Sequence, residues 1–169
     1  MKNLVIRPAV NSDIPAVTEI AALCWAPIYE GFTAILGEEL FALAYPDAIH
    51  AKQQAVAAAV QSGKVFAAEA DGVVCGFASY LINGSMGIIG NNAVHPDYKG
   101  QGIAPLLYAR LFEEFKSHGC TVARVHTGLD ENHAPARRAY EKMGFEAGLP
   151  GINYYKELSD ERTLPWISM

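Results

Sequence analysis

The segment from Val94 to Ala104 has the residue types best suited to chemistry in this 169-residue chain. It runs Val-His-Pro-Asp-Tyr-Lys-Gly-Gln-Gly-Ile-Ala, and an amphipathic helix is expected directly after it. A strand that stops at a proline, turns through glycines and enters a helix presents free backbone N–H groups at the positive end of the helix dipole. Gly100 and Gly102 let a ligand approach the backbone because they lack a Cβ. The segment therefore predicts an anion-binding cradle that suits a pyrophosphate.

Two common phosphate-binding motifs do not fit this segment. A P-loop needs a glycine, four intervening residues and then Gly-Lys followed directly by Ser or Thr, and the chain has no such run. A dinucleotide fingerprint that began at Gly100 would need glycine at position 105, where the chain has Pro105. An ordinary strand-to-helix turn that binds nothing is the remaining alternative.

Size and composition predict one domain over residues 1–169, because 18.2 kDa with 51% hydrophobic residues can form a sizeable core. The formal net charge is −5 and the basic residues are scattered, which argues against a nucleic-acid partner. The acidic balance mildly favours a cationic substrate over an anionic one.

The chain has few signals for membranes, metals or redox chemistry. The N-terminal residues lack the apolar core of a signal peptide, and no apolar run near the roughly 20 residues of a membrane span is expected. Cys24, Cys75 and Cys120 match no metal or redox spacing and are expected to be buried, reduced thiols. These features predict a cytoplasmic protein without a membrane partner or a metal.

Hydrophobic periodicity and turn residues divide the chain into strands and helices. Strands are expected over Leu4–Ile6, Val65–Ala70, Val73–Ile82, Gly87–Val94, Val122–Thr127 and Ile152–Glu157. Helices are expected from a cap at Ser12 or Asp13, in a second region broken at Tyr45-Pro46 and continuing over 48–61, and over 103–118 and 135–143. An antiparallel meander followed by strand–helix units predicts an α/β fold, with a mixed sheet and helices on its faces.

Two motifs resemble those of the GNAT N-acetyltransferase superfamily. Lys99-x-x-Gly102-x-Ala104 is similar to the family's Gln/Arg-x-x-Gly-x-Gly/Ala signature, and residues 94–98 match the strand end that leads into it. Residues 136–145, Ala-Arg-Arg-Ala-Tyr-Glu-Lys-Met-Gly-Phe, resemble the family's second motif. The opening Ile-Arg-Pro-Ala of residues 6–9 is a third, weaker match, and together the matches span most of the chain in the family's order.

The resemblance implies a fold and a reaction. The GNAT-like fold has a central, mostly antiparallel, twisted sheet of six to seven strands with four to five helices. The implied activity is transfer of an acetyl group from acetyl-CoA to a primary amine by direct attack, without an acyl-enzyme or a metal. Homodimers are frequent in the family, so a homodimer is a further expectation.

The resemblance also implies roles for particular residues. The backbone N–H of Val94 would polarise the thioester carbonyl, and Tyr140 would act as general acid toward the thiolate of CoA. Lys99 stands where Gln or Arg is usual, and His133 stands where the family often has an asparagine, with Asn132 one place earlier. The expected acetyl-CoA contacts are Val94, Lys99, Gly100, Gln101, Gly102, Ile103, Ala104 and either Asn132 or His133.

The acceptor side is less fully defined by the sequence. Many relatives place a glutamate base on the strand before the turn, where this chain has Asn91 and Asn92. His126, Glu30 or a chain of water molecules could accept the proton instead. The family's acceptor pocket is formed by the loop between the first two helices, here residues 25–32, so Trp25, Tyr29, Glu30 and His126 are the candidate substrate contacts. Aromatic rings with one carboxylate would suit a cation.

Three functions remain open at this point. The first is an acetyl-CoA-dependent N-acetyltransferase that modifies a small-molecule amine or an amino acid. The second is the same chemistry on protein N-termini or lysines. The third is a domain that binds acyl-CoA as a sensor without turnover, and an interaction module without CoA binding would require both motifs to be coincidental.

Overall fold

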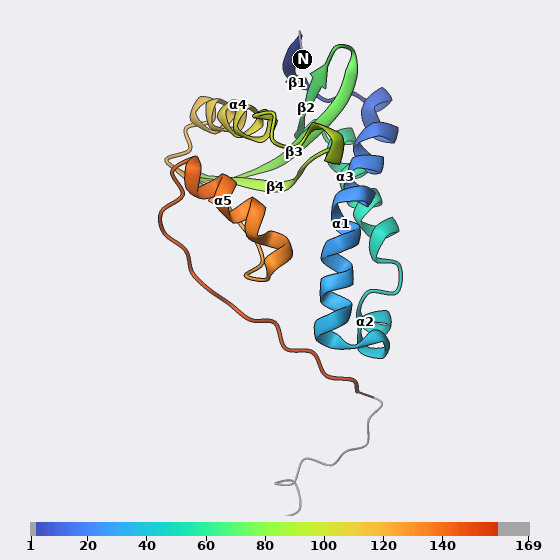
Figure 1. The fold of residues 1–169 in the computed structure, drawn as a ribbon. Coiled ribbons are helices and arrows are strands. Elements are labelled where there is room, and N and C mark those ends of the chain that lie inside the picture. The colour runs from blue at the N-terminus through green and yellow to red at the C-terminus, as the bar shows by residue number, and fades with distance from the viewer. Residues whose placement is uncertain (1–2, 159–169) are drawn as a thin grey trace, which may run out of the picture.

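The computed structural model describes residues 3–158, in which five strands form one sheet (Figure 1). The strands lie in chain order, antiparallel from β1 to β4, with β5 parallel to β4. They are β1 (Leu4–Pro8), β2 (Val65–Ala70), β3 (Val73–Asn83), β4 (Met86–Val94) and β5 (Val122–Val125). The helices are α1 (Ile14–Leu36), α2 (Glu38–Ala44), α3 (Ala48–Gln61), α4 (Ile103–Ser117) and α5 (Ala134–Lys142), with short 3-10 turns η1 (Asn11–Asp13), η2 (Pro96–Tyr98) and η3 (Glu131–His133).

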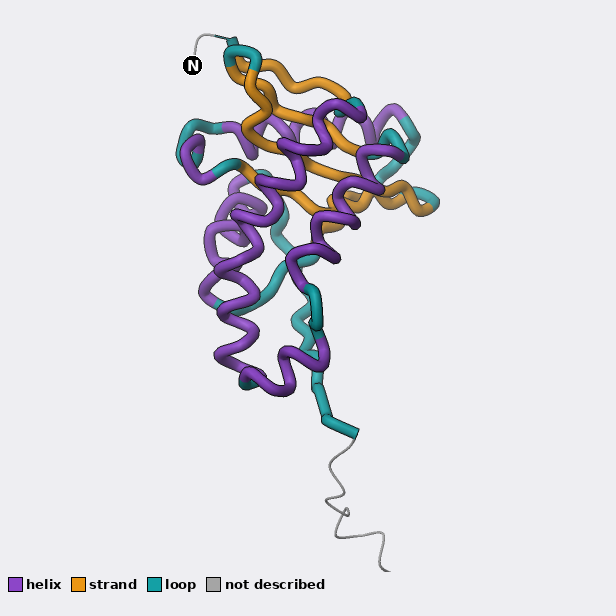
Figure 2. The backbone as a smooth tube through the Cα atoms, turned by 90° about the vertical axis from the view of Figure 1, so that its right-hand side faces the viewer, coloured by secondary structure: helices purple, strands orange, loops and turns teal. Residues whose placement is uncertain are grey.

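The sheet separates two hydrophobic cores. Side chains of successive strand residues point to opposite faces. Val65 and Phe77 therefore pack with α1 and α3 on one face, while Phe66 and Tyr80 pack with α4 on the other, where α5 adds Tyr140. Figures 1 and 2 show that the second half of α1, with α2, extends beyond the edge of the sheet. The α/β class and the mixed sheet predicted from the sequence are thus confirmed.

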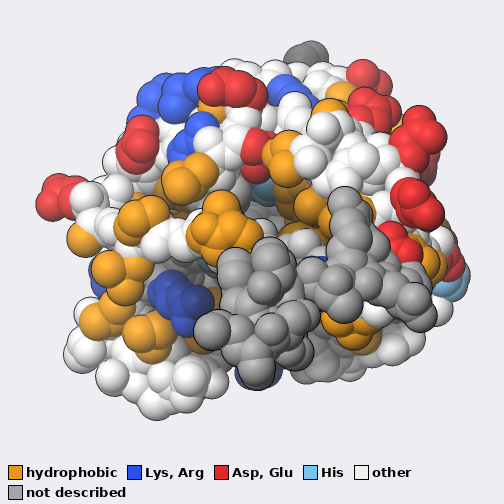
Figure 3. Space-filling model, turned by 90° about the horizontal axis from the view of Figure 1, so that it is seen from below, with side chains coloured by type: hydrophobic (Ala, Val, Ile, Leu, Met, Phe, Trp, Pro, Cys, Tyr) orange, Lys and Arg blue, Asp and Glu red, His pale blue; other side chains and the backbone are white. Residues whose placement is uncertain are grey.

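The described residues contain five strands instead of six to seven. The predicted strand Ile152–Glu157 pairs with no strand of the described sheet, and the chain over residues 146–158 runs away from the sheet in an extended form (Figure 1). Leu149, Ile152 and Tyr154 of this stretch are exposed. Figure 3 shows hydrophobic side chains exposed near the middle of the face seen from below, and many of the acidic ones along one edge of it. A strand needs a neighbouring strand for its backbone groups, and the five-stranded sheet of the described residues does not include this segment.

Helix α1 is longer than the sequence predicted. Residues 25–32, expected to form a loop between two helices, lie inside α1. Pro27 removes one backbone donor but does not end the helix, because Val17, Ile20 and Ala21 anchor its first half in the core. Among the described residues, the stretch Asn11–Leu36 also has the length and mean hydropathy (1.2) of a membrane span, which corrects the expectation that the chain has no such run. Core helices of soluble proteins pass the same test.

The sheet opens between β4 and β5. Strand β5 pairs only with Met86–Ile89 of β4, so the second half of β4 continues without a neighbour on that side. A β-bulge lies at this point, because the β3–β4 register shifts between Ala78 and Tyr80 and places both Gly90 and Asn91 opposite Ser79. The backbone of β4 from residue 90 to 94 is therefore accessible from a gap in the sheet.

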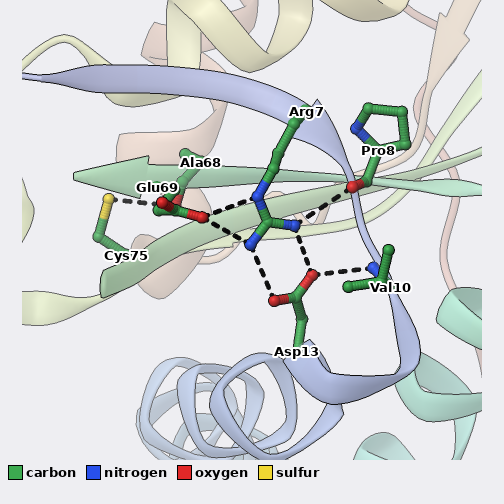
Figure 4. Close-up of polar contacts among 7 residues, drawn as sticks. All are labelled: Arg7, Pro8, Val10, Asp13, Ala68, Glu69 and Cys75. Carbon is green, nitrogen blue, oxygen red and sulfur yellow. Dashed lines mark hydrogen bonds and ion pairs between the residues drawn. The ribbon is translucent and has the colours of Figure 1, made fainter. Parts of the chain in front are cut away.

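An ion-pair network fastens α1 to the sheet (Figure 4). The guanidinium of Arg7 on β1 donates two hydrogen bonds to Asp13, at 2.7 and 2.9 Å, and one to Glu69 on β2, at 2.7 Å. Asp13 also accepts the backbone N–H of Val10 at 2.8 Å. These hydrogen bonds from Arg7, opposed by burial, lower the pKa of Asp13. The network fixes the angle at which α1 leaves β1.

We expect Asp13→Asn to lower the free energy of unfolding by about 2–3 kcal/mol at pH 7, because a buried charged partner of Arg7 is lost. An ionised group with a lowered pKa stabilises the fold above its unfolded pKa of about 3.9, and this contribution disappears as the pH falls through the folded value. Urea unfolding should therefore show that the difference between the two proteins shrinks below about pH 4. Glu113→Gln, at an exposed position on α4, is the control; an equal loss there would contradict the assignment.

Candidate functional site

A cavity of about 1030 Å³ lies where β4 and β5 separate. Its wall is formed by the second half of β4, the turn before α4, the residues after β5, the start of α5, and one side of α1. Ligand pockets in proteins are typically of about this size or smaller. The space can therefore hold an extended cofactor arm together with a second small molecule.

The predicted anion cradle forms one end of the cavity. Gly100 and Gly102 have φ angles of 76° and 78°, in the left-handed region that favours glycine. Lys99, Gly100, Gly102, Ile103 and Ala104 line the cavity at the N-terminus of α4. The side chain of Gln101 instead turns back, and its amide donates to the carbonyl of Asp97 at 3.2 Å. Only the backbone of Gln101 is thus left for the cradle.

Val94 presents its backbone toward the gap in the sheet. The N–H of His95 donates to the carbonyl of Cys75 on β3 at 2.8 Å. Because successive backbone groups of a strand point to opposite sides, the N–H and C=O of Val94 point away from β3. The carbonyl of Val94 accepts a hydrogen bond from the thiol of Cys24 on α1 at 3.3 Å. Cys24 and Cys120 are only half-buried, so of the three cysteines only Cys75 is buried as expected.

Tyr140 projects from α5 into the cavity, where it meets a polar network. The side-chain amide of Asn92 donates to Tyr140 Oη at 3.1 Å, and its carbonyl oxygen accepts Tyr108 Oη at 2.8 Å. The alternative bond, from Tyr140 Oη to the same carbonyl oxygen, is longer at 3.4 Å. In the shorter arrangement Tyr140 accepts from Asn92, so its own proton is free to be donated to a ligand.

Burial dominates the titration of both phenols. It raises the pKa of Tyr140, and the hydrogen bond from Asn92 and the neighbouring Tyr108 hydroxyl offset this only in part. The pKa of Tyr108 is also raised, first by burial and then by the neighbouring Tyr140. Both phenols are therefore neutral proton donors at physiological pH.

The short turn η3 closes the cavity against α1. The side-chain amide of Asn132 donates to the carbonyl of Pro27 at 3.0 Å. A Cβ on Gly31 would lie 2.4 Å from that amide, so only glycine permits this approach. His133 bonds Asp130 at 2.6 Å and stacks on Phe32 with ring centres 6.2 Å apart. Asn132 and His133 both line the cavity, so both remain candidates for the pantetheine contact.

The predicted acceptor contacts divide into two groups. Trp25 and His126 line the cavity, together with Phe32. Tyr29 does not line it and packs among Phe32, Phe41 and Tyr45 instead. Glu30 is exposed and also lies outside the lining, because it occupies an outward position of the continuous helix α1. The aromatic cluster with one carboxylate expected from the sequence therefore does not form at this cavity.

Several lining residues were not singled out from the sequence. The sequence shows Asn92 only as a residue that cannot act as a base, and Tyr108 only as part of the amphipathic helix 103–118. Lys52 comes from α3, far from either motif, and Arg138 and Lys142 lie within the second motif on α5, beside Tyr140. Tyr108 lies on the buried face of α4, and the β4 register brings Asn92 between Tyr108 and Tyr140.

The charges around the cavity have one sign. Lys52, Lys99, Arg138 and Lys142 line it, and none of the lining residues within 3–158 is an aspartate or glutamate. Within the same part of the chain, no three His, Cys, Asp or Glu side chains are grouped to hold a metal ion. The cavity is therefore suited to ligands that carry negative charge.

The chain belongs to the acetyltransferase (GNAT) family, because the sequence model of that family matches residues 17–145. Two curated relatives are an acetyltransferase of Pectobacterium atrosepticum, 30% identical over 95 residues, and a Bacillus subtilis protein provisionally named a ribosomal-protein-alanine N-acetyltransferase, 26% identical over 101 residues. The alignments cover 56% and 60% of this chain and 65% and 66% of the relatives, so the chain spans slightly less than two thirds of their lengths.

Solved structures share the fold. The PaiA N-acetyltransferase of Thermoplasma acidophilum, solved with coenzyme A, superposes with a TM-score of 0.70 at 21% identity, covering 86% of this chain and 91% of that one. The aminoglycoside N-acetyltransferase AAC(6')-Iy, solved with a bisubstrate analogue, gives 0.64 at 19% identity, covering 92% and 99%. The match of the family model to residues 17–145 confirms the family resemblance inferred from the two motifs.

Proposed function

We propose that the protein is an acetyl-CoA-dependent N-acetyltransferase that acts in the cytoplasm on the primary amine of a small molecule or amino acid. The observation that carries the proposal is one cavity that joins the glycine cradle, the open backbone of Val94 and the phenol of Tyr140. Family membership and the CoA-bound relatives support it. The protein is expected to form a homodimer.

The cradle fits the diphosphate of CoA. The positive φ of Gly100 and Gly102 directs the turn around the N-terminus of α4, where free N–H groups and the helix dipole favour anions. Lys99 would add a point charge, since its ammonium lacks the planar fork of an arginine. Arg138 and Lys142 on α5 line the same cavity and would add charge for the phosphates. Asn132 or His133 would contact the pantetheine arm.

The chemistry uses two groups of this chain. When bound, acetyl-CoA supplies the acetyl group as a thioester, whose carbon–sulfur bond breaks as the amine nitrogen bonds to the carbonyl carbon. The N–H of Val94 would stabilise the negative charge that develops on the carbonyl oxygen, an effect worth about 3 kcal/mol in other enzymes. Tyr140 Oη would donate its proton to the departing sulfur.

An acceptor amine that is protonated at neutral pH must also lose a proton before its nitrogen can attack the thioester. His126 lines the cavity and Glu30 does not, so His126, directly or through water, is the better candidate base. The half-buried thiol of Cys24 is not needed for direct transfer, and burial raises its pKa, which keeps it a thiol.

The proposal is tested by following free thiol release from acetyl-CoA with a panel of amino acids, alkylamines, polyamines, aminoglycosides and N-terminal peptides. Release with a small amine or amino acid, with acetylation confirmed by mass spectrometry, supports the proposal. Release with peptides alone would favour the second candidate, a protein N-terminal acetyltransferase, which the name of the Bacillus subtilis relative suggests. Acetyl-CoA binding without release would indicate a sensor, and absence of binding would contradict the cradle.

A further inference from the structure

The cavity wall carries one lysine that the proposed mechanism does not use. Lys52 lies on α3, outside both family motifs, and its side chain reaches the cavity beside Trp25 and Asn91. Its Nζ donates to Asn91 Oδ1 at 2.8 Å and lies 4.5 Å from the centre of the Trp25 ring. The ammonium is thus held at a defined point of the cavity by two neutral side chains.

Neither neighbour neutralises this charge. Asn91 accepts one of the three ammonium hydrogens, and the Trp25 ring attracts the cation through its face. Among the residues that the structure describes, Lys52 forms no ion pair, and no carboxylate lines the cavity. The side chain is half-buried, and the lost hydration lowers the pKa of Lys52. A partly desolvated cation of this kind is stabilised by an anion that enters the cavity.

The position of Lys52 separates it from the cations expected to bind CoA. Lys99 lies at the cradle, and Arg138 and Lys142 lie on α5. Lys52 instead reaches the cavity from the α1/α3 face of the sheet, opposite to Tyr140. Asn91 is bonded to Lys52 and the next residue, Asn92, to Tyr140, as expected for neighbours on opposite faces of a strand.

We infer that Lys52 binds a carboxylate of the acceptor, so that the acceptors of this enzyme are amines that also carry a carboxylate. The inference rests on the proposed acetyltransferase function and narrows its substrate class. Di- and polyamines are disfavoured, because a second ammonium would be repelled by Lys52 and would find no carboxylate among the described lining residues. The aromatic surface of Trp25 would pack on the hydrocarbon part of the acceptor.

The kinetic test compares acceptors that share the reacting amine and chain length and end in a carboxylate, a methyl group or a second ammonium. The wild type should favour the carboxylate series in kcat/KM by about tenfold or more. Lys52→Met should remove that preference, mainly by raising KM for the carboxylate series far more than for the methyl series. Lys52→Glu should shift the preference to the diamines. Lys64→Met is the matched control, because Lys64 also lies over an aromatic ring, that of Tyr80, but does not line the cavity.

A binding test does not depend on turnover. With CoA at saturation, benzoate and benzamide are titrated by ligand-observed NMR into the wild type and Lys52→Met. Benzoate should bind the wild type about tenfold more tightly than benzamide, and the variant should bind both alike. The inference would be overturned if the wild type bound benzoate and benzamide equally. It would also be overturned if Lys52→Met lowered kcat/KM by the same factor in all three acceptor series. Thiol release without a carboxylate preference would refute this inference alone, whereas failure to bind acetyl-CoA would refute the proposed function.

Discussion

Tyr140→Phe is expected to lower kcat by about 100-fold or more while the Kd for acetyl-CoA changes by less than about twofold. The substitution removes only Oη, and the ring keeps its contacts with Tyr108 and Phe145. Loss of a positioned proton donor affects the departure of the thiolate and not the binding of CoA. Stopped-flow or steady-state thiol release gives kcat, and calorimetry gives Kd.

Tyr108→Phe is the matched control for this prediction. It removes a phenol oxygen from the same network, but the proton of Tyr108 is already donated to Asn92, so Tyr108 can only help to position Asn92 and Tyr140. We expect a loss of kcat below about tenfold, and each variant should lose about 1 kcal/mol of stability with its hydrogen bond. Equal losses of kcat in the two variants would contradict the assignment of Tyr140 as the acid.

The pH dependence gives a second readout. A general acid must be protonated, and burial raises the pKa of Tyr140 above its usual value of about 10. Activity that depends on this proton should therefore persist to about pH 10 and fall only above it. The expectation would be contradicted if the wild-type kcat, on raising the pH, already fell before about pH 9 and this fall were absent in Tyr140→Phe.

Short-range features of the site could be predicted from the sequence. The cradle depends on neighbouring residues, since a strand end, two glycines and a helix start fix its backbone wherever it lies in the fold. The partners of Tyr140 depend on tertiary structure instead. Asn92 is 48 residues away in the chain and meets Tyr140 only because a β-bulge in β4 and the packing of α5 bring them together.

The residues around the expected acceptor site were harder to predict, because their positions also depend on tertiary structure. The family resemblance implied a loop over residues 25–32, but burial of the first half of α1 outweighs the backbone hydrogen bond lost at Pro27, and the helix continues. Glu30 consequently faces outward, and Lys52, 39 residues before its partner Asn91, supplies the charge in that region. Residues 152–157 contain an isoleucine and two tyrosines, residue types that favour strands, but the residue types do not show which edge of the sheet would accept them.

Gly102→Val should weaken acetyl-CoA binding by about 100-fold or more with only modest destabilisation of the fold. Gly102 has a φ of 78°, which costs a β-branched residue about 1–2 kcal/mol, and its added side chain has no protein atom within 4 Å of the Cβ position. The fold therefore tolerates the change, but the side chain would project into the cradle. Loss of two hydrogen bonds to a charged phosphate at about 1.5–3 kcal/mol each accounts for the expected effect.

Gly119→Val separates the loss of the cradle from backbone strain. Gly119 has a φ of 75° and equally open surroundings, but it follows the far end of α4 and does not line the cavity. Both variants should show a similar drop in melting temperature, because the strain is the same. Only Gly102→Val should lose affinity for acetyl-CoA in calorimetry, and the inorganic pyrophosphate that protects the wild type against thermal unfolding should no longer protect it. Unchanged affinity in Gly102→Val, or an equal loss in Gly119→Val, would show that the turn before α4 is not the phosphate site.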